Sequence, residues 1–595
     1  MSSLAILKTK FETAMLCEAD GRTDEAERLY LEILATDPKQ APAADRLGVM
    51  ALARLDPHTA VSWFETAIAA DANFPPALIN LGVAFRQLGR LDDAARAFAA
   101  VIMAWPDFAA AHYLLGQVVW EQGGYDEASQ YIRRAILFSP EFANDYQDQV
   151  YDRLSKCDWR GYEAMKALVT QLVKAGNPAT SPLNFMYYSN SIADQDQCAR
   201  TFARRNHPQR PALWNGEPRR PGKIRIGYLS SDFHDHPVAH LLAGVLEAHD
   251  RDAFEIVGFS CSPPMDQPIR QRIIPAFDAF LEVAHLNDLA IAQLVRGRDI
   301  DILVSLSGYT VNGRPDVLTG RPAPVQVNYH GYPGSLGAPY VDYLIADRQV
   351  VPEADARYYV EKLAWLPNSY QPTDDKVQIA DATPVRAEAG LPQDGFVFMA
   401  YNASRKISPD IFAAWMRILN RTPGSALWLM DSGEAAQTNL RREAQARGVD
   451  PGRLVFAPRL DSRADHLARH RLADLFIDTW PYNAHSTASD ALWAGLPVLT
   501  CEGDTFPSRV GASLVRAAGL GELATRSLVD YEDLAVDLAK DPARMAALRE
   551  RTRTDVHKSP LFQTAAYTRH LEAAYRTMFE RVQAGLPPQA FEVPA

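Results

Sequence analysis

The first quarter of the chain repeats itself at a constant interval of 34 residues. Four sets of positions keep this interval independently of one another. They are Leu47-Gly48, Leu81-Gly82 and Leu115-Gly116; Ala26, Ala60, Ala94 and Ala128; Tyr30, Phe64, Phe98 and Ile132; and Pro38, Ala72, Pro106 and Pro140. A fixed period of this length indicates stacked helix–turn–helix units, which bury a continuous core only by packing against their neighbours. We therefore predict an α-solenoid for this part of the chain.

The composition of the period narrows the class of repeat. Small residues let paired helices approach closely, and the aromatic and Leu positions fill the layer between them. With its closing proline, the pattern resembles tetratricopeptide repeats, about four of which would cover residues 6–141. The alternative is an irregular helical bundle, which has no reason to keep four sets of positions in one register. Such solenoids present a concave surface, so we predict that this region captures an extended peptide of a partner or substrate.

The bulk composition excludes several classes of protein. The 595 residues are too many for one hydrophobic core, so several domains are expected. A net charge of -12 argues against a nucleic-acid binder, which normally carries a basic surface. The five cysteines form no CxxC pair, which disfavours a zinc site or a disulfide framework and fits a reducing compartment. No segment approaches the ~20 apolar residues of a membrane span, so a cytoplasmic protein is expected.

The 34-residue period stops after residue 141, and residues 142–220 read as a helical connector. Helical spacing of apolar residues predicts helices over Tyr162–Lys174 and Gln195–Arg204. The stretch Asn206–Gly222 is rich in Pro, Arg and Gly, which is typical of a plain linker at a domain boundary.

From Lys223 onward, short apolar strands alternate with helices. The first series of predicted strands covers 224–229, 254–259, 302–306, 325–329 and 343–346; the second covers 396–400, 426–430, 454–456, 475–478 and 498–500. Alternation of this kind predicts parallel sheets, here two Rossmann-like domains over 221–370 and 393–560, followed by a C-terminal helix within 561–585 that packs on one of them. Ligands of this architecture bind at the carboxyl ends of the strands, so the loops there should face a shared cleft.

The stretch Leu472–Thr500 reads as strand, loop, helix and strand. His485, Ser486 and Thr487 stand where the helix begins, and Gly495 stands where it ends. A helix N-terminus at the carboxyl end of a strand attracts phosphate, because its free N–H groups and its dipole both favour an anion. The alternative is an ordinary capped helix.

Three more strand-end loops carry candidate residues. His236, with His240 four residues on, lacks a third metal ligand, so we interpret it as a base or a donor to a sugar hydroxyl, or else as a capping or packing residue. Gly334 belongs to a run of glycines that would let the backbone approach a ligand. Lys406, in the loop that also holds Asn402, would be a point charge for a diphosphate, the alternative being a solvated lysine.

Several long motifs then point to one family. The segments SSDFHDHPVAHLL, RPAPVQVNYHGYPGSLGAPYVDYLIAD and DTWPYNAHSTASDALWAGLPVLTCEGDTFPSRVGASL resemble the protein O-linked N-acetylglucosamine transferase family, as do the preceding repeats. The resemblance implies a GT-B fold and a metal-independent, inverting transfer of a sugar from a nucleotide diphosphate sugar to a Ser or Thr hydroxyl. It implies no cofactor, because the nucleotide sugar is a substrate.

The resemblance also assigns roles to residues. It places diphosphate and ribose contacts on His485, Ser486, Thr487 and Asp490, and nucleotide contacts on His466 and Arg469. It places the essential lysine on Lys406, which would stabilise the departing diphosphate, and the histidine of the HP motif on His236. His236 is therefore the candidate base, with Asn402 and Gly334 as further candidate contacts to the nucleotide sugar.

The chain departs from the usual family residues around the expected base and sugar pockets. Ala403 replaces Gln, Tyr329-His330 replaces Trp-Leu, and Ser305 and Tyr309 replace Asp and His. These changes leave the donor open between UDP-N-acetylglucosamine and a CMP-linked nonulosonic acid, the latter used to glycosylate flagellin. A third alternative is a non-catalytic adaptor, against which the presence of both Lys406 and the His-Ser-Thr motif argues.

Overall fold

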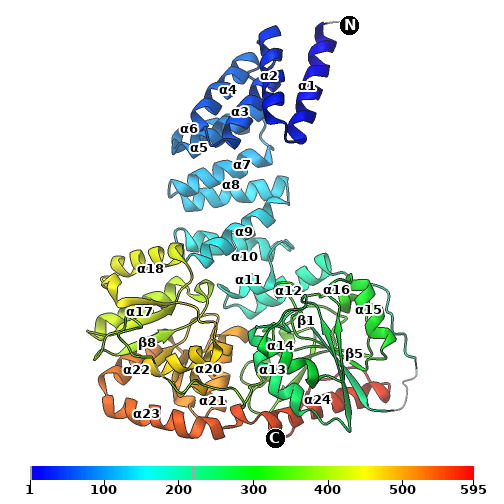
Figure 1. The fold of residues 1–595 in the computed structure, drawn as a ribbon, viewed down its shortest axis with the longest axis vertical. Helices are drawn as coiled ribbons and strands as arrows, with labels where there is room; N and C mark the ends of the chain where they lie inside the picture. Colours follow the sequence, from blue (N-terminus) through cyan, green and yellow to red (C-terminus); the bar gives the residue numbers. More distant parts are fainter. Residues whose placement is uncertain (1–2, 218–221, 383) are drawn as a thin grey trace. The chain divides into compact units, whose positions relative to one another are not determined.

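The structure, a computed structural model, describes residues 3–217, 222–382 and 384–595. The chain divides into two compact units (Figure 1). One comprises Met1–Asp148 with Arg160–Val169, and the other comprises Gln149–Trp159 with Thr170–Ala595.

The first unit is built from paired helices, as the 34-residue period predicts. They are α1 Ser3–Ala19, α2 Thr23–Thr36, α3 Ala41–Ala53, α4 Pro57–Ala70, α5 Pro75–Gln87, α6 Leu91–Ala104, α7 Ala109–Glu121 and α8 Tyr125–Phe138. A Cβ on Gly82 would lie 2.5 Å from the ring of Phe98, and Gly48 faces Phe64 in the same way. The Gly and aromatic positions repeat together because each glycine makes room for the aromatic ring of its own repeat.

The connector is helical, with α9 Phe142–Ser155, α10 Tyr162–Lys174, α11 Pro182–Met186 and α12 Ile192–Asn206. The interpretation of 206–222 as a plain linker is wrong for its described part. The backbone N–H groups of Arg210, Leu213 and Trp214 donate to the carbonyls of Thr319, Gly320 and Arg321, so this segment runs alongside the following domain. Residues 218–221 of the predicted boundary lie outside the described residues.

The second unit contains two parallel sheets. The first sheet consists of β1 Ile224–Ser230, β2 Phe254–Ser260, β3 Ala279–Glu282, β4 Ile302–Ser305, β5 Val325–Asn328, β6 Tyr343–Asp347, β7 Lys362–Leu366 and β14 Phe591–Glu592, in the order β14-β7-β6-β5-β4-β1-β2-β3. The second consists of β8 Val397–Ala400, β9 Ala426–Met430, β10 Leu454–Ala457, β11 Leu475–Ile477, β12 Val498–Cys501 and β13 Ala524–Thr525, in the order β10-β9-β8-β11-β12-β13. All ten predicted strands are present, and β3, β7, β13 and β14 were not predicted.

Helices cover both sheets (Figure 1). Those associated with the first sheet are α13 Pro237–Ala248, α14 Pro268–Ile273, α15 Asp288–Gly297, α16 Asp316–Thr319 and α24 Thr564–Gln583; those of the second half are α17 Pro409–Arg421, α18 Glu434–Ala446, α19 Arg463–Ala468, α20 Ser486–Trp493, α21 Val510–Ala517, α22 Leu528–Lys540 and α23 Pro542–Asp555. The predicted C-terminal helix is α24, which follows the second half in sequence yet buries Tyr567, Leu571 and Tyr575 in the core of the first.

The six strands of the second sheet have the order 3-2-1-4-5-6 counted along the chain, and the first six strands of the first sheet have the same order, with β7 and β14 added beyond β6. In this topology the chain reverses direction across the sheet between the first and fourth strands, and ligands bind in the crevice beyond their carboxyl ends. In the first half this point lies between β1 and β4, and in the second half between β8 and β11. The loops after β8 and β11 are those that hold Lys406 and His485, so the topology alone brings them together.

The two halves contact one another through hydrogen bonds. The Ser513 hydroxyl donates to the Asp347 carboxylate over 2.7 Å, and the Gln349 amide donates to Glu502 over 2.8 Å. An ion pair of 2.7 Å joins Arg509 and Asp355. The carboxyl-end loops of both sheets therefore belong to one continuous region of the second unit.

Candidate functional site

Lys406 and His485 meet on the ring of Tyr482. The Lys406 ammonium lies 4.3 Å from the centre of this ring and donates to the carbonyl of Asn483 over 2.9 Å. The His485 imidazole stacks on the same ring, with ring centres 4.9 Å apart and planes at 24°. The two groups that the sequence predicts on separate loops thus lie at one place.

The His-Ser-Thr motif opens α20 as predicted. Ser486 is the first residue of the helix, and Gly495 follows its end with φ = 80°, a backbone conformation that glycine adopts without strain. The Thr487 hydroxyl donates to Asn402 Oδ1 over 3.0 Å, which ties the helix N-terminus to the loop after β8. The first N–H groups of any helix lack intrahelical acceptors, so this end of α20 offers donors and a positive dipole to an anion.

Asp478, at the carboxyl end of β11, organises the loop between that strand and α20. Its carboxylate accepts from the N–H groups of Thr479 and Ala484 over 2.7 and 2.6 Å, and from the Thr500 hydroxyl over 2.7 Å. These bonds fix the turn that carries Tyr482. This role of Asp478 was not predicted, although an acidic residue directly after a buried strand is a signal for it.

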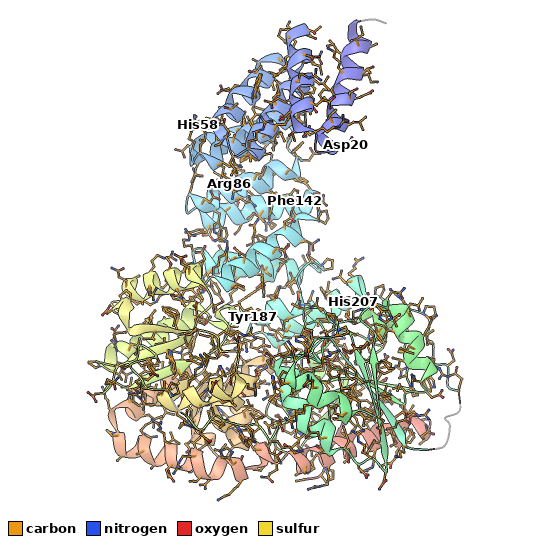
Figure 2. The ribbon with its side chains drawn as sticks, viewed as in Figure 1. Asp20, His58, Arg86, Phe142, Tyr187 and His207 are labelled. Carbon is orange, nitrogen blue, oxygen red and sulfur yellow. The ribbon has the colours of Figure 1, made fainter. Side chains whose placement is uncertain are left out.

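The connector also contributes an aromatic ring. Tyr187, labelled in Figure 2, stacks on the Tyr482 ring with centres 5.1 Å apart, and its hydroxyl accepts from Arg405 Nε over 2.8 Å. The Nε of Arg405 is therefore held by the connector, beside Lys406. Neither tyrosine was predicted, because nothing in a single sequence shows which aromatic residues of distant segments stack.

Burial controls the charges at this place. It lowers the pKa of Lys406 to about 7, against the opposing influence of the Asp478 carboxylate. Burial also lowers the pKa of His485 well below its ordinary value, and the Lys406 charge lowers it further. For Asp478, burial raises the pKa, while its hydrogen bonds act in the opposite direction. His485 is thus a neutral imidazole near pH 7, and Lys406 changes charge close to that pH.

His466 and Arg469 form a second group in this half. Arg469 Nη2 donates to His466 Nδ1 over 2.6 Å, and the guanidinium lies 4.7 Å above the ring of Tyr401, the residue directly after β8. Burial is the main cause that lowers the pKa of His466 to about 2, which keeps this ring neutral. The structure brings these two predicted residues together beside the loop of Asn402.

Asp490 lies one turn into α20, where its carboxylate accepts from Arg463 Nη2 over 2.7 Å. Arg463 and Asp490 both influence the pKa of His240, in α13 of the first half, and burial is the largest cause of its lowering. Asp490 already has a partner within the protein, so its predicted contact with a ribose hydroxyl requires a carboxylate shared with Arg463 and stays a prediction.

His236 is the residue that precedes α13, and it caps that helix. Its Nδ1 accepts from the N–H of Val238 over 3.3 Å, and the Asp232 carboxylate lies 3.9 Å from the same nitrogen. Burial lowers the pKa of His236. A neutral imidazole that accepts at Nδ1 carries its proton on Nε2, which makes Nε2 a donor. Of the roles predicted for His236, the geometry therefore favours capping and donation over that of a base.

Gly334 is explained by packing. A Cβ at this position would meet the methyl group of Met186 at 2.5 Å, and the Asn328 amide donates to the Gly334 carbonyl over 2.8 Å. The residue is buried in the loop after β5. A contact between Gly334 and a nucleotide sugar stays a prediction, and the structure gives the glycine a different reason to be small.

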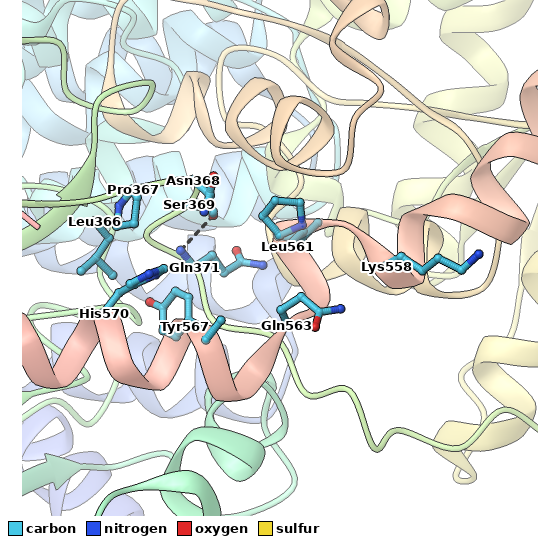
Figure 3. A pocket seen from close by; sticks show the side chains of 12 residues that line it. Leu366, Pro367, Asn368, Ser369, Gln371, Lys558, Leu561, Gln563, Tyr567 and His570 are labelled. Atoms are coloured by element: carbon cyan, nitrogen blue, oxygen red, sulfur yellow. Dashed lines mark hydrogen bonds between the residues drawn. The ribbon is translucent and has the colours of Figure 1, made fainter. Parts of the chain in front are cut away.

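A separate cavity of about 250 Å³ lies between the segment that joins the halves and the start of α24 (Figure 3). Its lining includes Ser369, Gln371 and Tyr567, and none of the predicted site residues. Gln371 donates to the Ser489 hydroxyl of α20 over 2.6 Å, so a hydrogen bond attaches the joining segment to the helix of the His-Ser-Thr motif.

Within residues 3–217, 222–382 and 384–595, no group of three or more His, Cys, Asp or Glu side chains is arranged to hold a metal ion. In the same described part of the chain, no helix has both the length and the apolar character that crossing a membrane requires.

Two protein families match this chain. Glycosyl transferase family 41 matches residues 156–383 and 371–571, and a tetratricopeptide repeat family matches residues 79–145. The chain is 38% identical over 377 residues to the probable UDP-N-acetylglucosamine–peptide N-acetylglucosaminyltransferase SEC of Arabidopsis thaliana, covering 62% of this chain and 38% of that protein. It is 26% identical over 564 residues to a UDP-N-acetylglucosamine–peptide N-acetylglucosaminyltransferase of Caenorhabditis elegans, covering 72% and 48%. The chain thus spans less than half the length of these relatives.

A solved structure of an O-GlcNAc transferase mutant from Thermobaculum terrenum superimposes with a TM-score of 0.63 at 27% identity, covering 92% of this chain and 99% of that one. The match confirms the predicted arrangement of a repeat solenoid followed by a GT-B fold of two Rossmann-like domains.

Proposed function

Because the chain belongs to glycosyl transferase family 41, we propose that it transfers N-acetylglucosamine from UDP-N-acetylglucosamine to Ser or Thr hydroxyls of a protein that its repeats capture. The names of the plant and nematode relatives specify this donor and a peptide acceptor. The tetratricopeptide match over residues 79–145 supports a region that captures the acceptor.

One observation carries the proposal. The Lys406 ammonium and the ring of His485, the residue that precedes α20, both lie against the Tyr482 ring, so a diphosphate bound here would meet a cation and the N–H groups of the first turn of that helix. As the bond between sugar and diphosphate breaks, negative charge builds on the departing nucleotide. A cation and a helix dipole that are already in position stabilise that charge without reorganisation.

The remaining site residues divide between nucleotide and acceptor. We assign Asn402, Ser486, Thr487 and Asp490 to the diphosphate and ribose, with His466 and Arg469 beside the nucleotide. His236, whose Nε2–H is free of the helix cap, is assigned to a hydrogen bond with a substrate hydroxyl. These assignments rest on the shared location of the loops after β1, β8 and β11.

The proposal includes an inverting, metal-independent reaction with no cofactor. Lys406 and α20 supply the positive charge that a divalent cation would otherwise provide. Turnover that persists in excess EDTA, and a product whose anomeric proton coupling shows the opposite configuration to the donor, would support it. Loss of turnover in EDTA, or retained configuration, would contradict it. The five free cysteines fit the proposed cytoplasmic location.

Calorimetric titration with UDP-N-acetylglucosamine, UDP and CMP tests the donor. We expect the two uridine ligands to bind and CMP to bind far more weakly. Binding of CMP but not UDP would favour the flagellin-glycosylating alternative, which the names of these relatives do not support. Binding of none of the three would favour the adaptor.

A further inference from the structure

His330 occupies an unusual backbone conformation at the carboxyl end of β5. Its φ is 74°, and the N–H of Gly331 donates to the carbonyl of Tyr329 over 3.1 Å, which closes a three-residue turn with His330 at its centre. A γ-turn with positive φ is the rare and strained form. Strain of this kind persists only where the surrounding structure holds it, and it concentrates at functional sites.

Packing on both sides holds this turn in place. A Cβ on Gly331 would collide with the carbonyl oxygen of Leu306, which directly follows β4, and would lie 3.2 Å from the side chain of Val238. Val238 is in the first turn of α13, two residues after His236. The backbone at His330 is therefore fixed against β4 and against the helix that His236 caps.

The His330 side chain is buried and has no hydrogen-bond partner. It is 8% exposed, and neither Nδ1 nor Nε2 has a partner among the described residues. Leaving a buried polar group unpaired destabilises the folded state, so native proteins rarely retain one without a reason. Here a strained backbone holds a ring with two unpaired nitrogens.

Electrostatic interactions link the ring to one predicted residue of each half. His236 lowers the pKa of His330, and His330 in turn lowers the pKa of His485. Burial is the main reason that the pKa of His330 falls to about 3. The ring is therefore neutral and offers one donor and one acceptor.

We propose that His330 binds a neutral hydroxyl or amide of the transferred sugar and thereby helps to select the donor. A sugar hydroxyl or an acylamino group can donate and accept at once, as a neutral imidazole can. A diphosphate only accepts, and Lys406 with the N-terminus of α20 already offers donors and positive charge for it. This inference rests on the proposed function, and it adds a residue that distinguishes one sugar from another.

Calorimetry with UDP and with UDP-N-acetylglucosamine tests the inference without an acceptor protein. The measured quantity is the ratio of the two dissociation constants, which isolates the contribution of the sugar. For His330→Leu we expect this contribution to fall about 5- to 30-fold, as for a lost buried hydrogen bond, while UDP affinity changes by less than about twofold. UDP-glucose and UDP-N-acetylgalactosamine should then bind the variant with affinities closer to that of UDP-N-acetylglucosamine.

Two further variants distinguish the effect of the imidazole from the effect of the strained backbone. His330→Gly removes the imidazole and relieves the positive φ, so it should fold well and show the same loss as His330→Leu. His330→Asn keeps a donor and an acceptor on a residue that tolerates this backbone, so it should retain affinity within about threefold of the wild type.

His249 provides the matched control, because it is a buried histidine of the same half whose two ring nitrogens bond to Glu572 and Tyr228. His249→Gln should lower the melting temperature without changing the ratio. One outcome is that the wild type binds UDP-N-acetylglucosamine while His330→Leu and His330→Gly both keep the wild-type ratio of the two dissociation constants. That result would refute the role proposed for His330 and leave the proposed function standing. If the wild type binds no UDP-sugar, both proposals are overturned.

Discussion

The two Rossmann-like halves share the order of their first six strands but carry different polar groups at the point where that order reverses. In the second half, the loops after β8 and β11 hold a lysine and a helix N-terminus. In the first half, the corresponding loops after β1 and β4 are joined by buried hydrogen bonds. The Ser307 hydroxyl accepts from the N–H of Ser231 over 3.0 Å and donates to Asp232 over 3.1 Å.

The fold gives both halves a ligand-binding crevice, and the side chains at its edge determine which ligand group each crevice binds. Both halves possess the crevice in which α/β proteins bind ligands. In the first half a carboxylate and two hydroxyls bond to one another there, which disfavours an anion, and neutral histidines stand nearby. We infer that the second half holds the diphosphate and that the first half contacts the sugar and the acceptor hydroxyl.

The largest expected effect comes from removing the cation of the second half. Lys406→Ala should lower kcat about 10²- to 10³-fold, because the charge on the departing diphosphate loses a preorganised partner. Rates of sugar transfer under saturating donor measure this. Lys376→Ala is the control, since its ammonium pairs with Glu247 and its side chain is 62% exposed. Normal transfer by Lys406→Ala would refute the division between the halves.

The first half is tested by His236→Asn. Asparagine is a good N-cap, so α13 and the melting temperature should be preserved, whereas the Nε2–H is lost. We expect transfer to slow about 10- to 100-fold with unchanged affinity for UDP. A variant that loses UDP affinity as strongly as it loses rate would show that the first half also holds the nucleotide.

The pH dependence of kcat/KM tests whether the charge of Lys406 controls the reaction. Burial lowers the pKa of Lys406 to about 7, so its ammonium is present below that pH and lost above it. Because kcat/KM reports the free enzyme, it should fall about tenfold per pH unit on the alkaline side of neutrality. Lys406→Arg keeps its charge at all these values and should abolish that decline. A wild-type profile that is flat to pH 9 would contradict this role.

The smallest expected effect is that of Thr487→Val. The Thr487 hydroxyl donates to Asn402 over 3.0 Å, and its removal should weaken UDP binding about fivefold, by roughly the 1 kcal/mol of one neutral hydrogen bond. Titration of UDP measures this. An equal loss in sugar transfer at saturating donor would indicate that this contact acts in the transition state instead.

Much of the fold was predictable because it depends on local patterns. The 34-residue period arises because contacts such as that of Gly82 with Phe98 recur in each repeat. Every predicted strand is an apolar run long enough to be recognised. Of the four strands that were not predicted, β13 and β14 have only two residues each and lack such a run. The loop of Lys406 and the motif at His485 were predicted because they follow strands of one parallel series.

The sequence by itself determined the repeats, the two parallel sheets and the side chains at the ends of their strands, since helical and strand periodicity and turn residues act over short stretches of chain. Only the tertiary structure decided that α24 completes the core of the first half, that Tyr482 joins Lys406 to His485, and that His330 is buried without a partner. The physical reason is that burial and the pairing of polar groups depend on segments hundreds of residues apart, and no local pattern records them.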